Sequence, residues 1–505
     1  MRKFSIITVL IFFVFLFLRI WGIQFGLPFD SLHPTEYFTV ESSLSYLHSG
    51  SYVPLNYQHP TLFQYVVSAV AGIFSVSSGN YQAVYLIGRF LSAMASFCAV
   101  IAVFFLSRHI FRSEFYALLA ASLFGCNLMC VKYAHYAVPD SFCLLFTTLS
   151  LVYAFRIADK GNLRDYVLNG LFCGLSIGSK WGGLIALGFF ICAHAVSPRD
   201  GRKYYKFLIG FTAACAVFVC TSPYHIINWK SVGAEFLRYL SEKGYSFPGA
   251  FLTRGFFSYS CKLLPGALGY VGFALALAGG WLFFKRLKKQ AIVIGIPSLA
   301  YFLIISFEQG GTLQNVLPLI PWFCISAVFM LDFLWQKKSF YSAGTLLAVI
   351  CIGQLFIQGL LFDIFLTKKD TRVVALEWLQ SHASEQSRIA FDPYTPYDLN
   401  RLQKSPAAEI FQAEYFIPSV AMYPAAFYKE NHFDYVVTSS FRQDNYRFFC
   451  GSVRECLPLR NYLSFQSELR LVARFAPSFL FFWSGFSSPW GTWPHNPVIS
   501  IYKVT

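Results

Sequence analysis

Long apolar runs alternate with short polar segments over the first 360 positions of this 505-residue chain. The runs recur at about 18 or more residues, the length that a helix needs to cross a bilayer. A large soluble core would not require runs of this length. The pattern therefore predicts an α-helical polytopic membrane protein, with the lipid bilayer as its surroundings.

Composition agrees with this prediction and excludes one class of partner. Hydrophobic residues make up 56% of the chain and charged residues only 13%, whereas soluble domains carry roughly 25% charged residues. The net charge of +15 is attributed to loops and to charge at the lipid surface. Nucleic-acid binding would need a soluble basic face, and none is visible, so no nucleic-acid partner is expected.

The basic residues orient the runs, because positive loops stay in the cytoplasm. Arg2 and Lys3 place the N-terminus inside. The first run has no cleavage site after it and is interpreted as a retained helix rather than a signal peptide. The run 62–76 either spans the membrane or lies along its outer interface, and the second choice puts the basic cluster 108–112 inside. Eleven spans follow: the run ending at Ile23, then 89–106, 115–130, 142–155, 166–179, 181–196, 207–221, 263–284, 292–306, 313–334 and 341–362.

The chain changes character after Thr367, where the long apolar runs end. A helix-like stretch over 371–381 is followed by four short β-like runs. These features predict a membrane domain over 1–366 and a small mixed α/β domain over 367–505, outside the membrane. Cys450 and Cys456 lie close together in its polar part and could form a disulfide or remain free thiols. The β-like runs are 387–391, 434–438, 469–475 and 498–504.

Acidic residues gather on the predicted outer face. The segment 24–59 has no Lys or Arg but contains Asp30, Glu36 and Glu41. Glu36 is either a solvated loop acid or a general base, because partial burial raises the basicity of a carboxylate. Asp140 follows Pro139 at the start of a predicted helix. It could cap that helix or add a second carboxylate to an outer site.

Basic residues on the same face suggest a phosphate-bearing ligand. Lys180 lies between two apolar runs, in Gly178-Ser179-Lys180-Trp181-Gly182-Gly183. It is either a lysine that reaches the interface from a helix end or a cation for a lipid phosphate. The segment 223–262 carries five Lys or Arg against two Glu, against the usual trend for outer loops. His33, His59, Tyr224 and Arg254 are further candidates on this face.

Several motifs, in order, resemble the GT-C class of membrane glycosyltransferases, and within it glycosyltransferase family 39. That family and its bacterial relatives comprise protein O-mannosyltransferases and lipid A aminoarabinose transferases. The resemblance covers nearly the whole chain, and the order and spacing of the motifs carry it. The motifs are Arg19 before Gly26-Leu27-Pro28, His33-Pro34-Thr35-Glu36, Tyr57-Gln58-His59-Pro60, Gly88–Ala93, Tyr136–Asp140, Gly174–Gly183, Ser222-Pro223-Tyr224, Leu317–Pro321, Asp370-Thr371-Arg372 and Glu377-Trp378-Leu379.

The resemblance implies an inverting transfer of a sugar from a polyprenyl-phosphate donor to an unidentified extracytoplasmic acceptor, which could be a lipid, a glycan or a protein. Glu36 and Asp140 would be the catalytic residues. The donor and its phosphate would be held by His33, His59, Lys180, Tyr224 and Arg254. No cofactor is implied, and a divalent metal is left open. The resemblance also implies a cell-envelope enzyme of the bacterial inner membrane.

The chain departs from the family pattern at two places. Thr35 stands where relatives commonly have Asp, and Gln314 and Asn315 stand where an Arg or Lys often precedes the Leu-Pro…Pro motif. Glu36 or Asp30 then takes the catalytic role, or the acceptor differs, or activity is lost. Two alternatives to an active enzyme follow: an inactive GT-C homologue that binds lipid-linked sugar as a scaffold, and a flippase or transporter of lipid-linked sugar.

Overall fold

The computed structural model describes eight stretches of the chain and two compact units. The stretches are 6–30, 36–77, 79–242, 254–308, 313–400, 404–450, 456–477 and 496–504, without the side chains of 242, 254, 445 and 448–450. Unit 1 comprises Met1–Ile23 and Ser42–Leu360, and unit 2 comprises Gln24–Glu41 and Leu361–Thr505. The predicted domain boundary at 366/367 stays a prediction.

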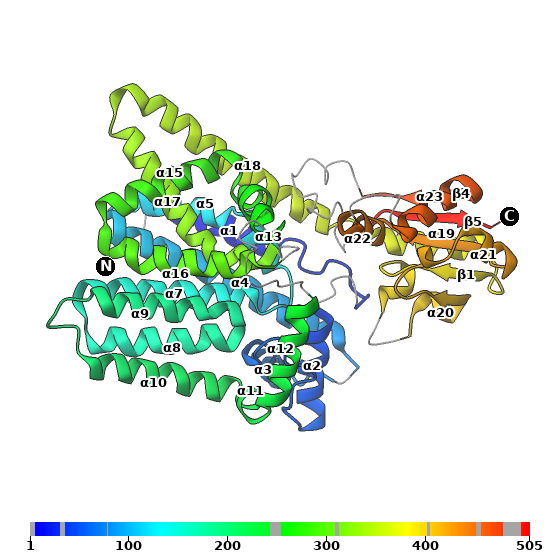
Figure 1. Cartoon of the computed structure of the whole chain (residues 1–505), viewed down its shortest axis with the longest axis horizontal. Helices are drawn as coiled ribbons and strands as arrows, with labels where there is room; N and C mark the ends of the chain where they lie inside the picture. Colours follow the sequence, from blue (N-terminus) through cyan, green and yellow to red (C-terminus); the bar gives the residue numbers. More distant parts are fainter. Residues whose placement is uncertain are drawn as a thin grey trace. The chain divides into compact units, whose positions relative to one another are not determined.

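Unit 1 is helical throughout its described residues (Figure 1). Helices α7, α8 and α10 pack side by side in it, and α4 packs on α5 and α7. Helices α2 (Glu36–Ser49) and α18 (Tyr341–Leu366) each contain a boundary between the units. The other elements are α1 (Ile6–Ile20), α3 (Leu62–Ile73), α4 (Tyr81–Phe111), α5 (Glu114–Gly125), α6 (Leu128–Ala134), α7 (Asp140–Lys160), α8 (Leu163–Ser179), η1 (Trp181–Leu184), α9 (Ile185–Val196), α10 (Tyr204–Thr221), α11 (Pro223–Ile227), α12 (Trp229–Glu242), α13 (Arg254–Phe257), η2 (Ser258–Leu263), α14 (Leu264–Leu268), α15 (Tyr270–Arg286), α16 (Lys288–Ser306), η3 (Leu313–Leu319), α17 (Ile320–Trp335) and η4 (Lys338–Phe340).

The helices support a multi-pass membrane protein but not the predicted number of spans. Among the described residues, six helices are long and apolar enough to cross a membrane, or eight if each of two bent pairs is one span. The prediction of eleven spans is therefore not confirmed. Three of the predicted elements form shorter apolar helices: Ile6–Ile20, Leu62–Ile73 and Trp181–Val196.

Two of the predicted spans are broken, which corrects the sequence analysis. The run 115–130 forms α5 and α6, which differ in direction by 60°. The Asn127 side chain causes this break by accepting from the backbone N–H groups of Met129 and Cys130, so that it caps a new helix. The run 263–284 contains a bend of 107° between α14 and α15. Gly269 lies at this bend with φ +73°, a conformation that favours glycine.

Unit 2 contains a five-stranded mixed sheet in the order β2-β1-β3-β5-β4. β1 pairs in parallel with β2 and β3, whereas β5 runs antiparallel to β3 and β4. The structure confirms four of the predicted strand runs as β1 (Arg388–Phe391), β3 (Tyr435–Ser439), β4 (Arg470–Phe475) and β5 (Ile499–Lys503). β2 (Gln412–Tyr415) was not predicted. The predicted helix 371–381 is confirmed as α19 (Thr371–His382).

Alternate residues of the central strands pack into two apolar cores, one on each face of the sheet. Phe391 and Val437 pack with α19, whereas Ala390 and Val436 pack with the helices on the opposite face. This is the period-two pattern of a strand that is buried on both faces. The remaining elements of unit 2 are η5 (Pro396–Leu399), α20 (Pro406–Ile410), η6 (Val420–Met422), α21 (Ala425–Glu430), α22 (Ser440–Cys450) and α23 (Leu457–Glu468).

The cysteines divide as their sequence context suggests. Eleven cysteines, all before Lys368, are free, whereas Cys456 is disulfide-bonded. The side chain of Cys450 lies outside the described residues, so its pairing with Cys456 stays a prediction.

Candidate functional site

The clearest polar site of unit 1 lies where α7 begins and α8 ends. Asp140 is the first residue of α7, directly after Pro139, and Lys180 follows the last residue of α8. Because Lys180 has extended backbone (φ −160°, ψ 146°), the chain leaves the helix there. The Lys180 Nζ donates to Asp140 Oδ1 at 2.6 Å, with side chains only 12% and 7% exposed. The structure thus brings together two residues that the sequence analysis selected separately.

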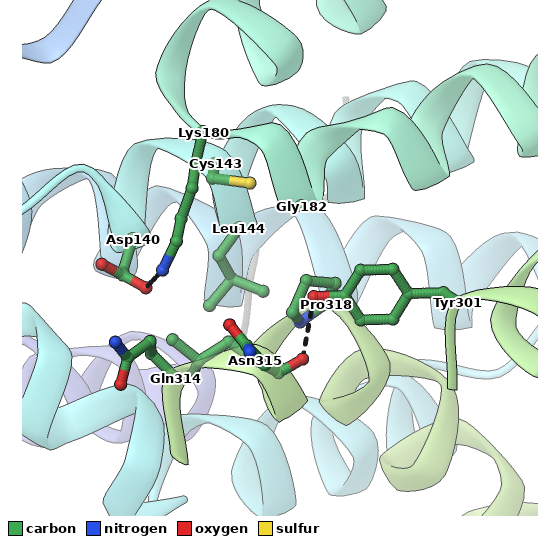
Figure 2. A pocket seen from close by; sticks show the side chains of 10 residues that line it. Asp140, Cys143, Leu144, Lys180, Gly182, Tyr301, Gln314, Asn315 and Pro318 are labelled. Carbon is green, nitrogen blue, oxygen red and sulfur yellow. Dashed lines mark hydrogen bonds and ion pairs between the residues drawn. The ribbon is translucent and has the colours of Figure 1, made fainter. Parts of the chain in front are cut away.

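A small cavity adjoins this ion pair (Figure 2). Its volume is about 10 Å³, roughly the space that one water molecule or one hydroxyl group occupies. It has room for one compact group rather than for a whole lipid-linked molecule. Its lining comes from α7, α8, η1, α16 and η3, and comprises Asp140, Cys143, Leu144, Lys180, Gly182, Tyr301, Gln314, Asn315, Leu317 and Pro318.

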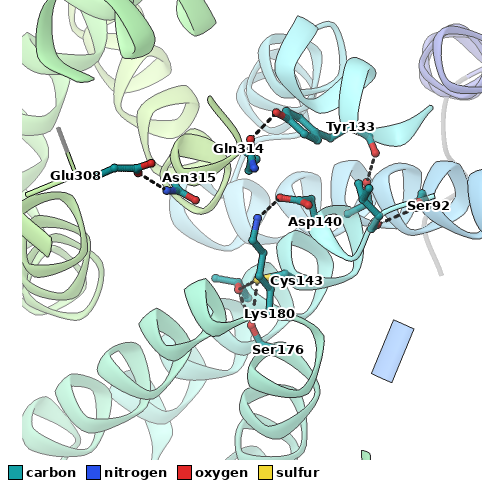
Figure 3. A network of polar contacts seen from close by, with 12 residues as sticks. Ser92, Tyr133, Asp140, Cys143, Ser176, Lys180, Glu308, Gln314 and Asn315 are labelled. Atoms are coloured by element: carbon teal, nitrogen blue, oxygen red, sulfur yellow. Dashed lines mark hydrogen bonds and ion pairs between the residues drawn. The ribbon is translucent and has the colours of Figure 1, made fainter. Parts of the chain in front are cut away.

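Hydrogen bonds hold the two amide side chains of η3 (Figure 3). The Tyr133 hydroxyl donates to Gln314 Oε1 at 2.8 Å. Asn315 Nδ2 donates to Glu308 Oε2 at 3.0 Å, and the Tyr259 hydroxyl donates to the same oxygen at 2.9 Å. The backbone carbonyl of Asn315 also accepts from the Tyr301 hydroxyl at 2.9 Å. Since the partners come from separate helices, η3 is fixed relative to α6 and α16.

Close packing fixes the segment that carries Lys180. A Cβ on Gly183 would lie 2.3 Å from the carbonyl oxygen of Ser176, so only glycine fits between η1 and α8. Below the ion pair, the hydroxyls of Ser176 and Thr147 are 2.7 Å apart and join α8 to α7. Lys180 is therefore held by a rigid turn rather than by a flexible loop.

His59 lies near Lys180 but does not provide a second cation. Burial is the main reason that its pKa falls to about 3, and the Lys180 charge lowers the pKa further. His59 is thus neutral at neutral pH, and any contact with a donor phosphate would be a neutral hydrogen bond. Nearby, Thr61 ties this segment to the end of α10, because its N–H donates to Ser222 Oγ and its hydroxyl to the carbonyl of Thr221.

The other predicted site residues have different positions. Tyr224 lies in α11, partly buried, next to the buried His225, whose ring contacts the Tyr57 and Trp181 rings. Glu36 is the first residue of α2, is buried, and belongs to unit 2. His33 lies outside the described residues, as does the side chain of Arg254 at the start of α13.

Sequence reasoning did not select Lys132 or Glu308 as site residues, although both carried a usable signal. Lys132 is the one charged residue of α6, is 1% exposed, and lies with its Nζ 4.9 Å from the centre of the Tyr133 ring. A charge inside an apolar segment is a functional hypothesis by default. Glu308 ends an apolar run and is 1% exposed. Within the part of the chain that the structure describes, no group of three or more His, Cys, Asp or Glu side chains is placed to hold a metal ion.

Comparison with known proteins places this geometry in a wider class. The family described as dolichyl-phosphate-mannose-protein mannosyltransferase matches residues 58–227, which include Asp140 and Lys180. The crystal structure of ArnT from Cupriavidus metallidurans bound to undecaprenyl phosphate matches with a TM-score of 0.50 and 14% identity, over 74% of this chain and 71% of that chain. The chain has a GT-C fold.

A second solved structure matches almost the full length of this chain. The oligosaccharyltransferase AglB from Archaeoglobus fulgidus, in complex with an inhibitory peptide and a dolichol-phosphate, has a TM-score of 0.53 and 12% identity, over 99% of this chain and 74% of that chain. The structure of ArnT from Cupriavidus metallidurans in the apo state matches with a TM-score of 0.50 and 13% identity, over 98% of this chain and 97% of that chain. Among curated protein sequences, none matches this chain. The chain is thus similar to GT-C membrane glycosyltransferases, including those of family 39.

Proposed function

We propose that this protein is an inverting membrane glycosyltransferase that moves a sugar from a polyprenyl-phosphate donor to an extracytoplasmic acceptor. The observation that supports this most is the Lys180–Asp140 pair beside a small cavity. A lysine ammonium has three N–H donors. Asp140 is its hydrogen-bond partner among the described residues, so two donors are left for phosphate oxygens.

The chemistry explains why one cation at this position would accelerate transfer. An acceptor hydroxyl oxygen forms a bond to the anomeric carbon while the bond from that carbon to the phosphate oxygen breaks. The bonding electron pair stays with the leaving lipid phosphate, whose negative charge grows by one unit. Because Lys180 attracts the leaving phosphate more strongly than the donor diester, it lowers the barrier rather than only binding the substrate. Asp140 orients the ammonium group and helps to place the substrate.

The acceptor proton needs a base, and Glu36 is the proposed one. It lies beside Thr35, the position where relatives commonly have Asp, and it is buried at the start of α2. A carboxylate can take the acceptor proton as the new glycosidic bond forms. Tyr224, the neutral His59, His33 and Arg254 are proposed as further donor contacts, and the basic segment 223–262 as a second phosphate-attracting surface.

We also propose the orientation that the charge pattern favours. The N-terminus would be cytoplasmic, and a C-terminal domain over 367–505 would be extracytoplasmic, in a bacterial inner membrane. The acceptor would then be a lipid, glycan or protein of the cell envelope. The first observation to make is the mass of glycolipids and glycoproteins in a strain that lacks the gene, since a missing sugar on one of them would identify the acceptor.

A transfer assay with the Glu36→Gln variant tests the assignment of the base. The amide is close in shape to the carboxylate but does not accept the proton, so transfer should fall about 100-fold or more while lipid binding is kept. Transfer at the wild-type rate would exclude Glu36 as the base. Wild-type protein that moves intact lipid-linked sugar across a vesicle membrane, without hydrolysing or transferring it, would instead favour the transporter alternative.

A further inference from the structure

We infer that Gln314 and Asn315 form a neutral subsite that binds hydroxyl groups of an uncharged sugar. Both amides line the cavity beside Lys180 and Asp140. This inference rests on the proposed function, because it names the class of sugar whose hydroxyl groups the wall of the same cavity would contact. It depends on how the hydrogen bonds in Figure 3 orient the two amides.

The orientation of Asn315 follows from its buried partner. Glu308 is 1% exposed, and its Oε2 accepts from both Asn315 Nδ2 and the Tyr259 hydroxyl. The NH₂ group of Asn315 must therefore face Glu308, as the 3.0 Å contact shows, and it also lies 3.3 Å from the Tyr259 hydroxyl. The carbonyl oxygen of the Asn315 side chain is left, within the described residues, as an acceptor at the cavity.

The amide of Gln314 is hydrogen-bonded through its oxygen, whereas the amide of Asn315 is hydrogen-bonded through its nitrogen. The Oε1 of Gln314 accepts from the Tyr133 hydroxyl at 2.8 Å, so the NH₂ group of Gln314 is left as a donor within the described part of the chain. The cavity wall thus offers one donor and one acceptor on consecutive residues. A sugar hydroxyl can accept from the first and donate to the second, and neighbouring hydroxyls can do both at once.

The charges of the cavity argue against a charged sugar. Lys180 and Asp140 already neutralise each other at 2.6 Å. Neither amide carries charge, so an ammonium or carboxylate on the sugar would lose water without gaining a counter-ion there. A neutral hexose or pentose meets no such penalty. Gln314 and Asn315 are therefore expected to determine which donor is used, while Lys180 contacts the phosphate that all donors share.

Binding of matched lipids to the purified full-length protein tests this inference. The probes are undecaprenyl phosphate alone, the same lipid carrying glucose, mannose or galactose, and the same lipid carrying glucosamine. At least one neutral sugar should bind more tightly than the bare lipid, and glucosamine should not. Gln314→Leu and Asn315→Leu should each lower the affinity for that neutral lipid by about threefold to tenfold, the value of one hydrogen bond, and leave the bare lipid unchanged.

The controls separate this inference from the proposed function. Gln82→Leu makes the same change at an exposed position of α4 and should alter no affinity. If wild-type protein binds none of the lipids, the proposed function fails and the inference fails with it. If the bare lipid binds but the neutral sugars add nothing, or glucosamine binds best, the proposed function stands and the inference is wrong.

Glu308→Gln provides a second test that leaves the cavity lining intact. A glutamine at 308 can donate or accept, so it no longer forces the amide of Asn315 into one orientation. The preference for the neutral sugar over the bare lipid should fall about threefold or more, with undecaprenyl phosphate affinity unchanged. Equal losses for both lipids would show that Glu308 only maintains the fold and would count against the inference.

Discussion

Two buried carboxylates, one in each unit, show how different surroundings separate a reactive group from a structural one. Asp140 in unit 1 meets a single cation, Lys180, at the edge of a cavity. Asp392 in unit 2 is fully buried at the end of β1 and is surrounded by neutral donors. It accepts from the Ser419 hydroxyl and the Val420 N–H through one oxygen, and from the Tyr462 hydroxyl and the Ser439 N–H through the other.

The two carboxylates differ in how much hydrogen-bonding capacity remains unused around them. The four acceptor contacts of Asp392 join β1 to β3, η6 and α23 and use both of its carboxylate oxygens. Lys180 and Asp140 satisfy each other with one contact and keep unused donors and acceptors facing a cavity. A saturated carboxylate stabilises one packing arrangement, whereas an unsaturated ion pair can exchange partners with a ligand. The predictions below test this distinction.

The largest expected effect is that of Lys180→Met. Removal of a charge that stabilises the leaving phosphate should lower transfer by about 100- to 1,000-fold. A radiolabelled sugar-transfer assay measures this, with Lys285→Met as the matched control, since Lys285 lies exposed against Trp281 in α15. A variant that loses stability but transfers sugar normally would make the Lys180–Asp140 pair structural and remove the contrast with Asp392.

The pH dependence of unit 2 should come next in size. Burial raises the pKa of Asp392 to about 6, and its hydrogen bonds only partly oppose this. The folded state therefore binds the proton more tightly than the unfolded chain, whose Asp pKa is about 3.9. The contribution of Asp392 to the free energy of unfolding is complete below about pH 4 and is lost as the pH rises through about 6. The free energy changes by roughly 2 to 3 kcal/mol over this range. Hydrogen exchange of β1 and β3 amides at pH 4.5 and 7.5 measures it.

Gly183→Ala should have an intermediate effect on the unit 1 site. The new methyl group would overlap the Ser176 carbonyl and push η1 away from α8. Overpacking of this kind costs about 1 to 3 kcal/mol, and here it would also displace Lys180. Thermal unfolding and undecaprenyl phosphate binding should both weaken. Gly295→Ala in α16 is the control, because a Cβ there meets nothing within 4 Å; equal behaviour of the two variants would contradict the packing argument.

Asp392→Asn should have the smallest effect near neutral pH, about 1 kcal/mol or less. The amide replaces one acceptor oxygen and so loses two of the four contacts, but the variant no longer buries a charge, and the two changes offset each other. The exchange profile of β1 and β3 should also lose its dependence on pH between 4.5 and 7.5. If the dependence persists in this variant, another group causes it.

Sequence patterns predicted the parts of this molecule that rest on composition or on isolated charges. Lys180 was selected because it lies between two apolar runs, Asp140 because it begins a predicted helix at the outer face, and β3 because its short run is β-like. The pairing of Lys180 with Asp140 was not predictable from their spacing of 40 residues. It depends on α7 and α8 packing side by side.

Other features lacked a distinctive local signal. β2 is short and partly exposed, and the alternation in Gln-Ala-Glu-Tyr is too brief to indicate a strand, so its pairing with β1 defines it. Gly269 lies in a small, apolar stretch that is equally compatible with a straight span. Its positive φ and its contact with Gln354 become visible only in the fold. Glu308 was overlooked because its role depends on Tyr259 and Asn315, which lie on different segments.

Helix α10 links the surrounding lipid to the segment that carries His59. Only 11% of the residues of α10 are buried. A Cβ on Gly170 of α8 would lie 1.9 Å from the carbonyl oxygen of Gly210 in α10, so the two helices approach closely there. Because α10 packs closely on α8 at Gly170, Gly174 and Gly178, a tilt of α10 with bilayer thickness would move the two helices together. The end of α10 holds Thr61 through Thr221 and Ser222. The length of the lipid chains in the host membrane would therefore change the affinity for the donor, so that the cell and not only the sequence determines this affinity.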